Sequence, residues 1–156
     1  MTMSNRGGRW RRLFVIPLLL SLLAAACGSS TDNGAEPEGL TDGPIKVAFV
    51  YVGPIGDAGW TYQHDVGRKE MEEALGDKVE TSFLESVPEG AESEAVFERL
   101  AQEGNKVIFG TSFGYGDPML AVAARHPETV FMHATGYKTA ANLGTYFGAA
   151  EEARYL

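Results

Sequence analysis

Cysteine is almost absent from this sequence, since Cys27 is the only one among 156 residues. A single thiol excludes an internal disulfide framework and a cysteine-based zinc site. Basic residues are also scarce, with 13 lysines and arginines against 21 acidic residues. Four of these basic residues are arginines within the first 26 positions, so the remainder carries a formal charge of −12. Because an acidic body repels phosphates, we expect no nucleic-acid partner and no electrostatic docking on anionic membranes.

Long hydrophobic runs are also lacking, apart from one near the N-terminus. Residues 13–26 (LFVIPLLLSLLAAA) are 14 mostly apolar residues, fewer than the roughly 20 that a membrane-spanning helix needs. They follow a polar, basic stretch over residues 1–12, a combination typical of a secretory signal peptide. We therefore predict a signal peptide over residues 1–26.

The end of this segment resembles a bacterial lipobox, because three alanines (Ala24–Ala26) lead directly into Cys27. In a lipobox the cysteine thiol receives a lipid and becomes the mature N-terminus, although the position held here by Ala24 is usually leucine. We predict lipidation at Cys27 and hence a protein anchored in the cell membrane at its extracytoplasmic face. An ordinary signal peptide with an incidental cysteine is the alternative.

Residues 27–43 join this N-terminal segment to the body of the chain. They contain glycine, serine and acidic residues with one sizeable apolar side chain, Leu40, and so cannot bury a core. We predict a flexible tether that lets a folded domain stand clear of a membrane. A disordered N-terminus without that role fits the same composition.

Residues 44–156 alternate between short apolar runs and segments with helical periodicity. The first run, IKVAFVYV, is continuous and rich in valine and aromatics, which is typical of a strand buried on both faces. Strands that alternate with helices predict an α/β fold with a parallel sheet flanked by helices. The expected strands cover 45–52, 79–83, 106–110, 129–133 and 143–147, and the expected helices cover 62–75, 91–103, 117–126 and 149–156.

In parallel α/β sheets, ligands bind beyond the carboxyl ends of the strands. This rule selects the loops at residues 53–60, 111–116 and 134–142. The first loop, GPIGDAGW, has neither a dinucleotide-binding spacing nor a P-loop lysine. It is either a flexible connection or a place where backbone amides approach a ligand beside the flat face of Trp60.

The second loop carries the one enzyme motif of the chain. Residues 110–114, GTSFG, match the G-x-S-x-G nucleophile elbow of α/β-hydrolases, with Glu128 and His133 following as acid and base. Against this hypothesis, an elbow needs its helix to begin at once, whereas further loop residues precede the expected cap at Asp117. His133 also falls inside an expected strand. A serine hydrolase that uses Ser112 therefore stays as an alternative.

Other candidate residues have weaker signals. Asp117, directly before a proline, is expected to cap a helix, and a carboxylate there can also accept hydrogen bonds from a ligand amine. Lys138 and Asn142 are candidates through their position after the fourth strand. The three histidines lack the spacing of a metal site, so no metal and no cofactor is predicted. Phe83, Phe97, Phe131, Met119 and Met132 are expected in the core.

Several long motifs, in order, resemble the basic membrane protein family, whose members are lipoprotein substrate-binding components of ABC transporters. They are YVGPIGDAGWTYQHDVGRKEMEEALGDKV, ESVPEGAESEAVFERLAQEG, VIFGTSFGYGDPML, HATGYKTAANLGTYFG and EEARYL. The resemblance implies a type I periplasmic-binding-protein-like fold that traps a purine base or nucleoside for delivery to an ABC permease. It also implies a stacking role for Trp60 and ligand contacts from Asp57, Ser112, Phe113, Asp117, Lys138 and Asn142.

The same resemblance implies that residues 44–156 are the N-terminal lobe alone, truncated near the hinge, with the second lobe absent. One lobe supplies one wall of the cleft, so we expect weak purine binding or none by this chain. Three hypotheses stay open: a transport receptor, a serine hydrolase using Ser112, and a truncated lipoprotein that binds nothing.

Overall fold

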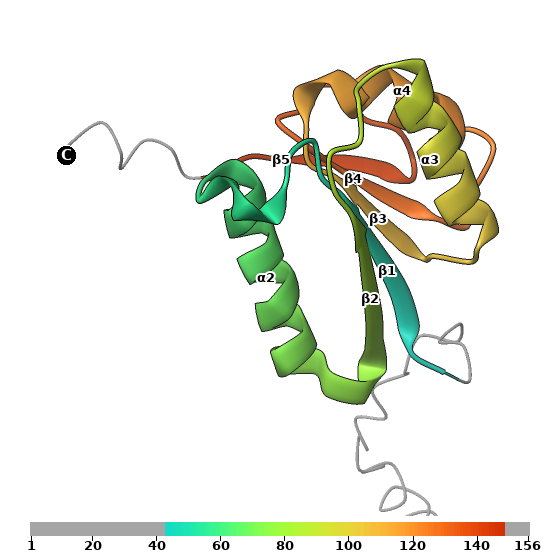
Figure 1. Cartoon of the computed structure of the whole chain (residues 1–156). Coiled ribbons are helices and arrows are strands. Elements are labelled where there is room, and N and C mark those ends of the chain that lie inside the picture. The colour runs from blue at the N-terminus through green and yellow to red at the C-terminus, as the bar shows by residue number, and fades with distance from the viewer. Residues whose placement is uncertain (1–42, 149–156) are drawn as a thin grey trace, which may run out of the picture. The chain divides into compact units, whose positions relative to one another are not determined.

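A computed structural model describes residues 43–148 of the chain, and these form a parallel five-stranded sheet with helices on both faces (Figure 1). The strands are β1 (Ile45–Val50), β2 (Val79–Leu84), β3 (Val107–Gly110), β4 (Val130–Ala134) and β5 (Leu143–Tyr146). The helices are α2 (Trp60–Leu75), α3 (Ala91–Gln102) and α4 (Gly116–Ala123), with short 3-10 turns η1 (Ile55–Asp57), η2 (Gly76–Lys78) and η3 (Phe113–Tyr115). This confirms the predicted α/β fold.

Several predictions fall on residues that the structure does not describe. These are the signal peptide over 1–26, lipidation at Cys27, the tether up to residue 42, and the helix expected over 149–156. Within residues 43–148, no helix has both the length and the apolar character needed to cross a membrane.

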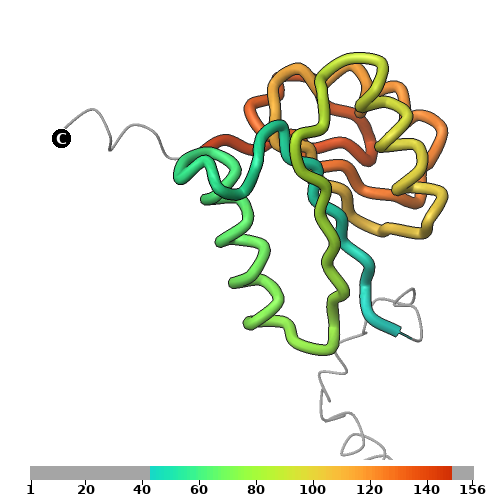
Figure 2. The backbone as a smooth tube through the Cα atoms, viewed as in Figure 1, coloured from blue at the N-terminus to red at the C-terminus, as the bar shows by residue number. Residues whose placement is uncertain are grey.

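The strand order is β2-β1-β3-β4-β5, and every neighbouring pair is parallel. The loops that follow the strands at their carboxyl ends therefore gather at one end of the sheet, as the chain path in Figure 2 shows. Helix α2 lies on one face of the sheet, and α3 and α4 lie on the other (Figure 1). This arrangement is the one that right-handed crossovers require for this strand order.

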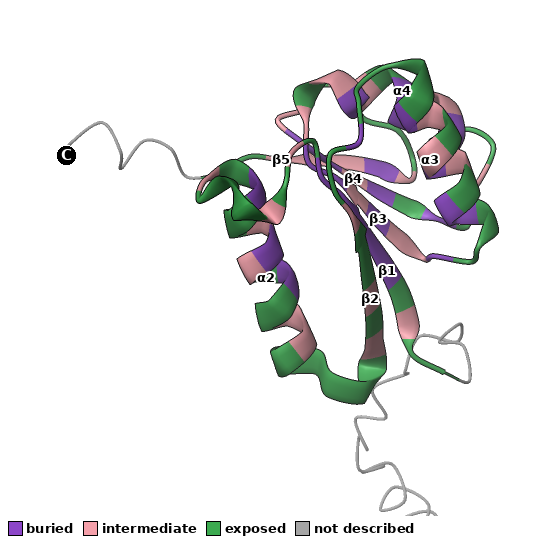
Figure 3. Ribbon diagram, viewed as in Figure 1, coloured by how far each residue is buried: buried purple, intermediate pink, exposed green. Residues whose placement is uncertain are grey.

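The central strands are buried on both faces, as the continuous apolar run predicted. Ala48 and Val50 face a core cluster that includes Phe97 of α3, while Val47 and Phe49 face the α2 side. Figure 3 shows the buried residues concentrated along the middle of the sheet. Phe97 and Phe131 are fully buried, as expected, and so is Met119.

Phe83 was expected in the core, but its side chain is 41% exposed. Strand β2 is an edge strand, so one side of this ring has no neighbouring strand to cover it. Its ring stacks on Tyr51, and the Arg68 guanidinium lies 4.8 Å from its centroid. Phe83 therefore lies between a core aromatic ring and a guanidinium group at the edge of the sheet, and is not enclosed in the core.

Helix α2 turns an unexpected face to the sheet. The apolar residues of the helix expected over 62–75 recur roughly at helical spacing and predict an apolar face made of Tyr62, Val66, Met71, Ala74 and Leu75. Met71 does pack against the core, but Tyr62 and Leu75 are exposed, and the buried residues are Thr61, Asp65 and Arg68. The polar face is tolerated because Arg68 Nε donates to Asp65 Oδ1 at 2.9 Å. Buried charges that pair and hydrogen-bond in this way are the ones that proteins retain.

Glycines with a positive φ lie at the ends of two helices, and the bounds of the third helix differ from the predicted ones. Gly76 ends α2 with a positive φ of 54°, and Gly104 has a φ of 85° just after α3. The helix expected over residues 117–126 instead spans Gly116–Ala123, so Asp117 lies in its first turn and does not cap it. Its carboxylate contacts Lys138 instead.

A charged cluster joins α3 to the segment after α4 and makes stability depend on pH. Glu98 accepts hydrogen bonds from His126 at 2.8 Å and from Arg125 at 3.0 Å, and these two contacts lower its pKa from 4.5 to about 2. Since the folded chain holds this carboxylate ionised, its stabilising contribution is present above pH 4.5 and is lost as the pH falls toward about 2.

We expect Glu98→Gln to flatten the loss of thermal stability between pH 4.5 and about 2. Melting temperatures followed by circular dichroism across this pH range would measure the slope. Glu80→Gln, at an exposed carboxylate of β2, is the charge-matched control. Parallel slopes for the two variants would contradict the assignment to Glu98.

Candidate functional site

The chain leaves β1 and β3 in opposite directions, which makes the space beyond their carboxyl ends the topological switch point of the sheet. Trp60, the first residue of α2, lies at this point. Its indole Nε1 donates a hydrogen bond of 2.5 Å to the carbonyl oxygen of Thr111, directly after β3. This contact ties the loop after β1 to the loop after β3 and fixes the ring, which is 41% exposed.

Asp57 holds the turn that delivers Trp60. One carboxylate oxygen accepts from the backbone amides of Gly59 and Tyr62, at 2.8 and 3.0 Å, and the other accepts from Thr61 at 2.9 Å. These backbone hydrogen bonds, led by that from Gly59, lower the pKa of Asp57 to about 2. The Asp57 carboxylate thus accepts hydrogen bonds from amides at the start of α2 that have no partner within the helix. Asp57 therefore has a structural role, and both of its oxygens are already engaged when a ligand arrives.

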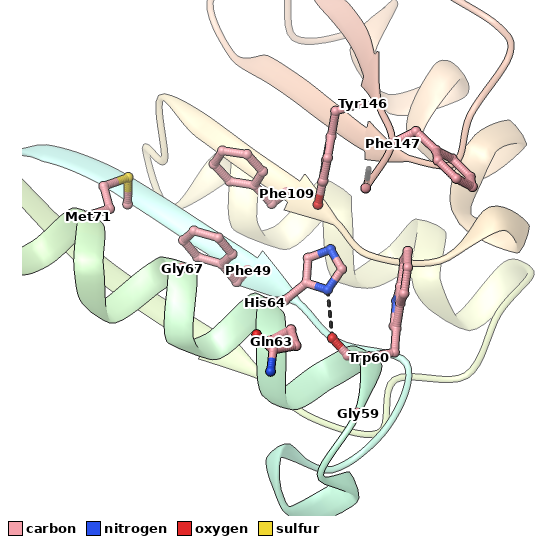
Figure 4. A pocket seen from close by; sticks show the side chains of 11 residues that line it. Phe49, Gly59, Trp60, Gln63, His64, Gly67, Met71, Phe109, Tyr146 and Phe147 are labelled. Carbon is pink, nitrogen blue, oxygen red and sulfur yellow. Dashed lines mark hydrogen bonds between the residues drawn. The ribbon is translucent and has the colours of Figure 1, made fainter. Parts of the chain in front are cut away.

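Trp60 also borders an apolar cavity of about 630 Å³ on the α2 side of the sheet. Figure 4 shows His64 beside the Trp60 ring, with its Nδ1 in hydrogen-bond contact with the Trp60 carbonyl oxygen at 2.8 Å. The His64 and Trp60 ring centroids are 4.7 Å apart. The lining residues come from β1, β3, α2 and the end of β5: Phe49, Gly59, Trp60, Gln63, His64, Gly67, Met71, Phe109, Tyr146, Phe147 and Gly148.

A smaller, polar pocket of about 110 Å³ lies at the carboxyl ends of β3 and β4. Three residues expected from the sequence line it: Phe113, Asp117 and Lys138. Phe113 is 61% exposed and stacks on Tyr137, with ring centroids 6.0 Å apart and an interplanar angle of 24°. The pocket therefore combines aromatic faces with charged groups at one edge.

Asp117 and Lys138 form an ion pair across this pocket, with Oδ1 and Nζ 2.5 Å apart. The Asp117 side chain is 80% exposed and that of Lys138 is 40% exposed, so both are accessible from solvent. The hydrogen bond to Asp117 raises the pKa of Lys138 and keeps the amine charged. Together they offer a carboxylate acceptor and an ammonium donor to a ligand with both kinds of polar group.

His133 also lines this pocket, although the sequence offered it only as the base of a hydrolase and as a residue of a strand. It is 2% exposed at the end of β4, and its Nε2 donates to the Ser112 carbonyl oxygen at 2.8 Å. Gly116 and Gly136 lie so close to the imidazole that a side chain at either position would overlap it or press against it. The sequence signal that could have pointed to this arrangement is the two glycines themselves, one at the start of α4 and one shortly after β4.

Ser112 is not arranged as a catalytic nucleophile. Its hydroxyl donates to the Glu89 carboxylate at 2.5 Å, while His133 contacts the Ser112 carbonyl oxygen and not the hydroxyl. Its backbone is extended, with φ −140° and ψ 149°, rather than the strained turn of a nucleophile elbow. The serine–histidine contact that a hydrolase requires is therefore not formed in this arrangement.

Asn142 does not lie with the other candidates. Its side-chain amide donates to the carbonyl oxygens of Ala123, His126 and Thr129, at 2.8 to 3.0 Å, at the amino-terminal end of β4. The loop after β4 runs back along the sheet before β5 begins at Leu143, so Lys138 and Asn142 reach opposite ends. Asn142 fastens α4 to the sheet and takes no part in the site proposed below.

Metal binding finds no support among residues 43–148, where no cluster of three or more histidine, cysteine or acidic residues is placed to hold an ion. His64 and Asp65, adjacent in the sequence, serve different partners. His64 contacts the Trp60 carbonyl oxygen, and Asp65 pairs with Arg68 and Lys69.

Two solved structures with a similar arrangement are solute-binding proteins of ABC transporters. One from Aeropyrum pernix aligns with a TM-score of 0.59 at 26% identity over 67% of this chain and 28% of its own length. One from Conexibacter woesei aligns with a TM-score of 0.56 at 19% identity over 66% of this chain and 35% of its own length. The fold is therefore that of the periplasmic-binding class.

Residues 45–156 match the family model named Bmp, described as ABC transporter substrate-binding protein PnrA-like. The chain belongs to this family, as the sequence motifs predicted. A purine-binding protein of Brucella abortus is 59% identical over 112 residues, 72% of this chain and 32% of that protein. A protein of Haloferax volcanii named for glucose binding in an ABC transporter is 49% identical over 127 residues, 81% of this chain and 31% of that protein.

The chain thus spans about a third of the length of the relatives it matches. Both relatives are named for the binding of a small molecule and neither for catalysis. The hydrolase hypothesis for Ser112 therefore lacks support from the relatives as well as from the geometry.

Proposed function

We propose that this chain is the N-terminal lobe of an extracytoplasmic, lipid-anchored receptor that captures a purine base or nucleoside for an ABC permease. The observation that carries this proposal is the gathering of exposed aromatic faces and a charged pair at one end of the sheet. Trp60 stands at the β1–β3 switch point, and Phe113, Asp117 and Lys138 line the adjoining polar pocket. The purine-binding relative from Brucella abortus supports the choice of ligand.

The anchor and the location are part of the same proposal. The basic start, the short apolar run and the alanines before Cys27 are typical of an exported lipoprotein. The glycine-rich, acidic residues 27–43 then serve as a tether between the lipid and the folded lobe. A receptor tethered in this way stays close to the permease to which it passes its ligand.

Aromatic side chains are the natural partners of purines, because every base presents a flat π-face. Stacking of one base on one aromatic ring contributes roughly 1–3 kcal/mol. The hydrogen bond from Trp60 to Thr111 orders the ring before a ligand arrives, so little conformational entropy is lost on binding. Asp117 accepts hydrogen bonds from base or ribose donors, and Lys138 donates to ring nitrogens or hydroxyls.

Calorimetric titration of the chain carrying Cys27→Ser with adenine, guanine, adenosine and guanosine tests this proposal. Because one lobe supplies one wall of the cleft, we expect any purine binding to be weak, and we expect Trp60→Ala to weaken it by a further factor of roughly tenfold or more through the loss of one stacking contact. Tyr62→Ala is the matched control, since Tyr62 is 45% exposed on the same helix and lines neither cavity.

Two results would count against the proposal. The first is equal purine affinity in the Trp60→Ala and Tyr62→Ala variants. The second is tighter binding of glucose, included because of the Haloferax volcanii relative, than of any purine. A folded chain that binds no purine would instead support the truncated, non-binding alternative.

A further inference from the structure

Glu89, in the loop between β2 and α3, reaches across to the end of β3. The same carboxylate oxygen, Oε1, accepts two hydrogen bonds, from the Ser112 hydroxyl at 2.5 Å and from the Gly114 backbone amide at 2.9 Å. Gly114 lines the polar pocket, and Ser112 lies directly before Phe113, which lines it too. The protein therefore places a negative charge of its own where a ligand would meet free donors.

The Glu89 carboxyl group also lies directly against Gly114. A Cβ atom on Gly114 would overlap the carboxyl group of Glu89. The missing side chain at Gly114 lets the carboxylate lie against the backbone and accept its amide. Both groups that donate to Glu89, the Ser112 hydroxyl and the Gly114 backbone amide, are uncharged.

Other carboxylates lie at this end of the sheet. Glu85 accepts from the Ile55 amide at 2.5 Å, and Asp57 accepts three backbone amides that lower its pKa to about 2. Asp117 is paired with Lys138, which is the one amine that lines the polar pocket. A phosphate group that approached this edge would be repelled by these carboxylates. The backbone amides that could donate to the phosphate already donate to the carboxylates.

We propose that Glu89 is a specificity-determining residue, whose carboxylate admits uncharged bases and nucleosides and rejects their phosphorylated forms. This inference rests on the proposed function, since it concerns the same pocket. Like charges brought together at a binding site weaken the wrong complex. Glu89 therefore acts by repulsion, and its removal affects charged ligands far more than neutral ones.

The test uses the full chain carrying Cys27→Ser, with ¹H–¹⁵N NMR of the backbone amides at residues 111–117. Adenosine and adenosine monophosphate are titrated into the parent chain, Glu89→Gln and Glu92→Gln. Glu92 is an exposed carboxylate in the first turn of α3, so the two variants have the same net charge and the same amide side chain. We expect Glu89→Gln to bind the monophosphate roughly fivefold or more tightly than Glu92→Gln, with adenosine affinity equal within twofold.

Inorganic phosphate, titrated into the same three proteins, gives a readout that does not require purine binding. Larger shifts at the Ser112 and Gly114 amides in Glu89→Gln than in Glu92→Gln would support the role of Glu89. Equal monophosphate and phosphate binding by the two variants would overturn it, whatever adenosine does. Failure of all three proteins to bind adenosine would contradict the proposed function, and the phosphate titration would still decide on Glu89.

Discussion

Asp65→Ala is expected to lower the free energy of unfolding by about 3 kcal/mol, because it leaves a buried arginine without its main partner. Asp65 is 1% exposed and Arg68 is 7% exposed, and their side chains meet at 2.9 Å between α2 and the sheet. The Tyr51 hydroxyl donates to the same Asp65 oxygen at 3.4 Å. Alanine would remove an acceptor that serves both groups in the interior.

The expected loss lies at the lower end of the usual range for a broken buried pair. Arg68 keeps two contacts through Nη1, with Glu72 at 3.0 Å and with the Thr81 hydroxyl at 2.9 Å. Burial opposes ionisation of Asp65, but hydrogen bonds from Lys69 and Arg68 outweigh it and lower the pKa of this carboxyl. Its contribution to stability is therefore present above the ordinary pKa of aspartate and is lost on acidification.

Urea unfolding followed by circular dichroism measures this effect in the chain carrying Cys27→Ser. Glu73→Ala is the matched control, since Glu73 is exposed on the same helix and its loss is expected to change stability by less than about 0.5 kcal/mol. A loss for Asp65→Ala no larger than that of the control would show that Arg68 is held by its other contacts alone.

The buried polar face of α2 shows where prediction from the sequence stops. The run IKVAFVYV could be assigned to a strand covered on both sides, because continuous apolar residues have few other places in a soluble fold. Helix periodicity, in contrast, identified only part of the face of α2 that meets the sheet, since Met71 packs against the core but Tyr62 and Leu75 are exposed. A charged residue becomes compatible with burial only through a partner, and here Tyr51, directly after β1, and Thr81 of β2 are partners that lie outside α2.

The residues of the candidate site also divide into those that the sequence could predict and those that it could not. The switch-point rule correctly brought together the loops that hold Trp60, Phe113 and Asp117, because parallel strands end on the same side of a sheet. It placed Asn142 on that side too, since the sequence does not show that the loop after β4 returns to the other end of the sheet. Glu89 escaped notice because its importance comes from a contact 23 residues along the chain, and exposed glutamates are common.

His133 leads to the second large effect that we expect, at Gly136 in the loop after β4. A Cβ atom at this position would overlap Nδ1 and would lie 2.9 Å from Cγ and Cε1 of the imidazole. The ring cannot move away easily, because it is 2% exposed and bonded to the Ser112 carbonyl oxygen at 2.8 Å. Either the loop or the histidine must therefore shift, and overpacking of this kind costs about 1–3 kcal/mol.

Gly136→Ala is thus expected to reduce stability by about 2 kcal/mol and to displace the two residues that follow it. Tyr137 would leave its stacked position on Phe113, and Lys138 would leave Asp117, so the variant should lose any purine affinity that the parent chain shows. Urea unfolding measures the first effect and calorimetric titration the second. Gly56→Ala is the control, because no atom lies within 4 Å of the position that its Cβ would take.

A second substitution separates a collision with the ring from a general requirement for glycine. In a chain that already carries His133→Ala, the space left by the imidazole accepts the new methyl group, so Gly136→Ala should then cost little. The difference between the two backgrounds is the coupling energy of a double-mutant cycle, which we expect to be at least about 1 kcal/mol. If Gly136→Ala costs the same with and without the ring, the glycine is needed for its own backbone conformation, and the close contact with His133 does not position the loop.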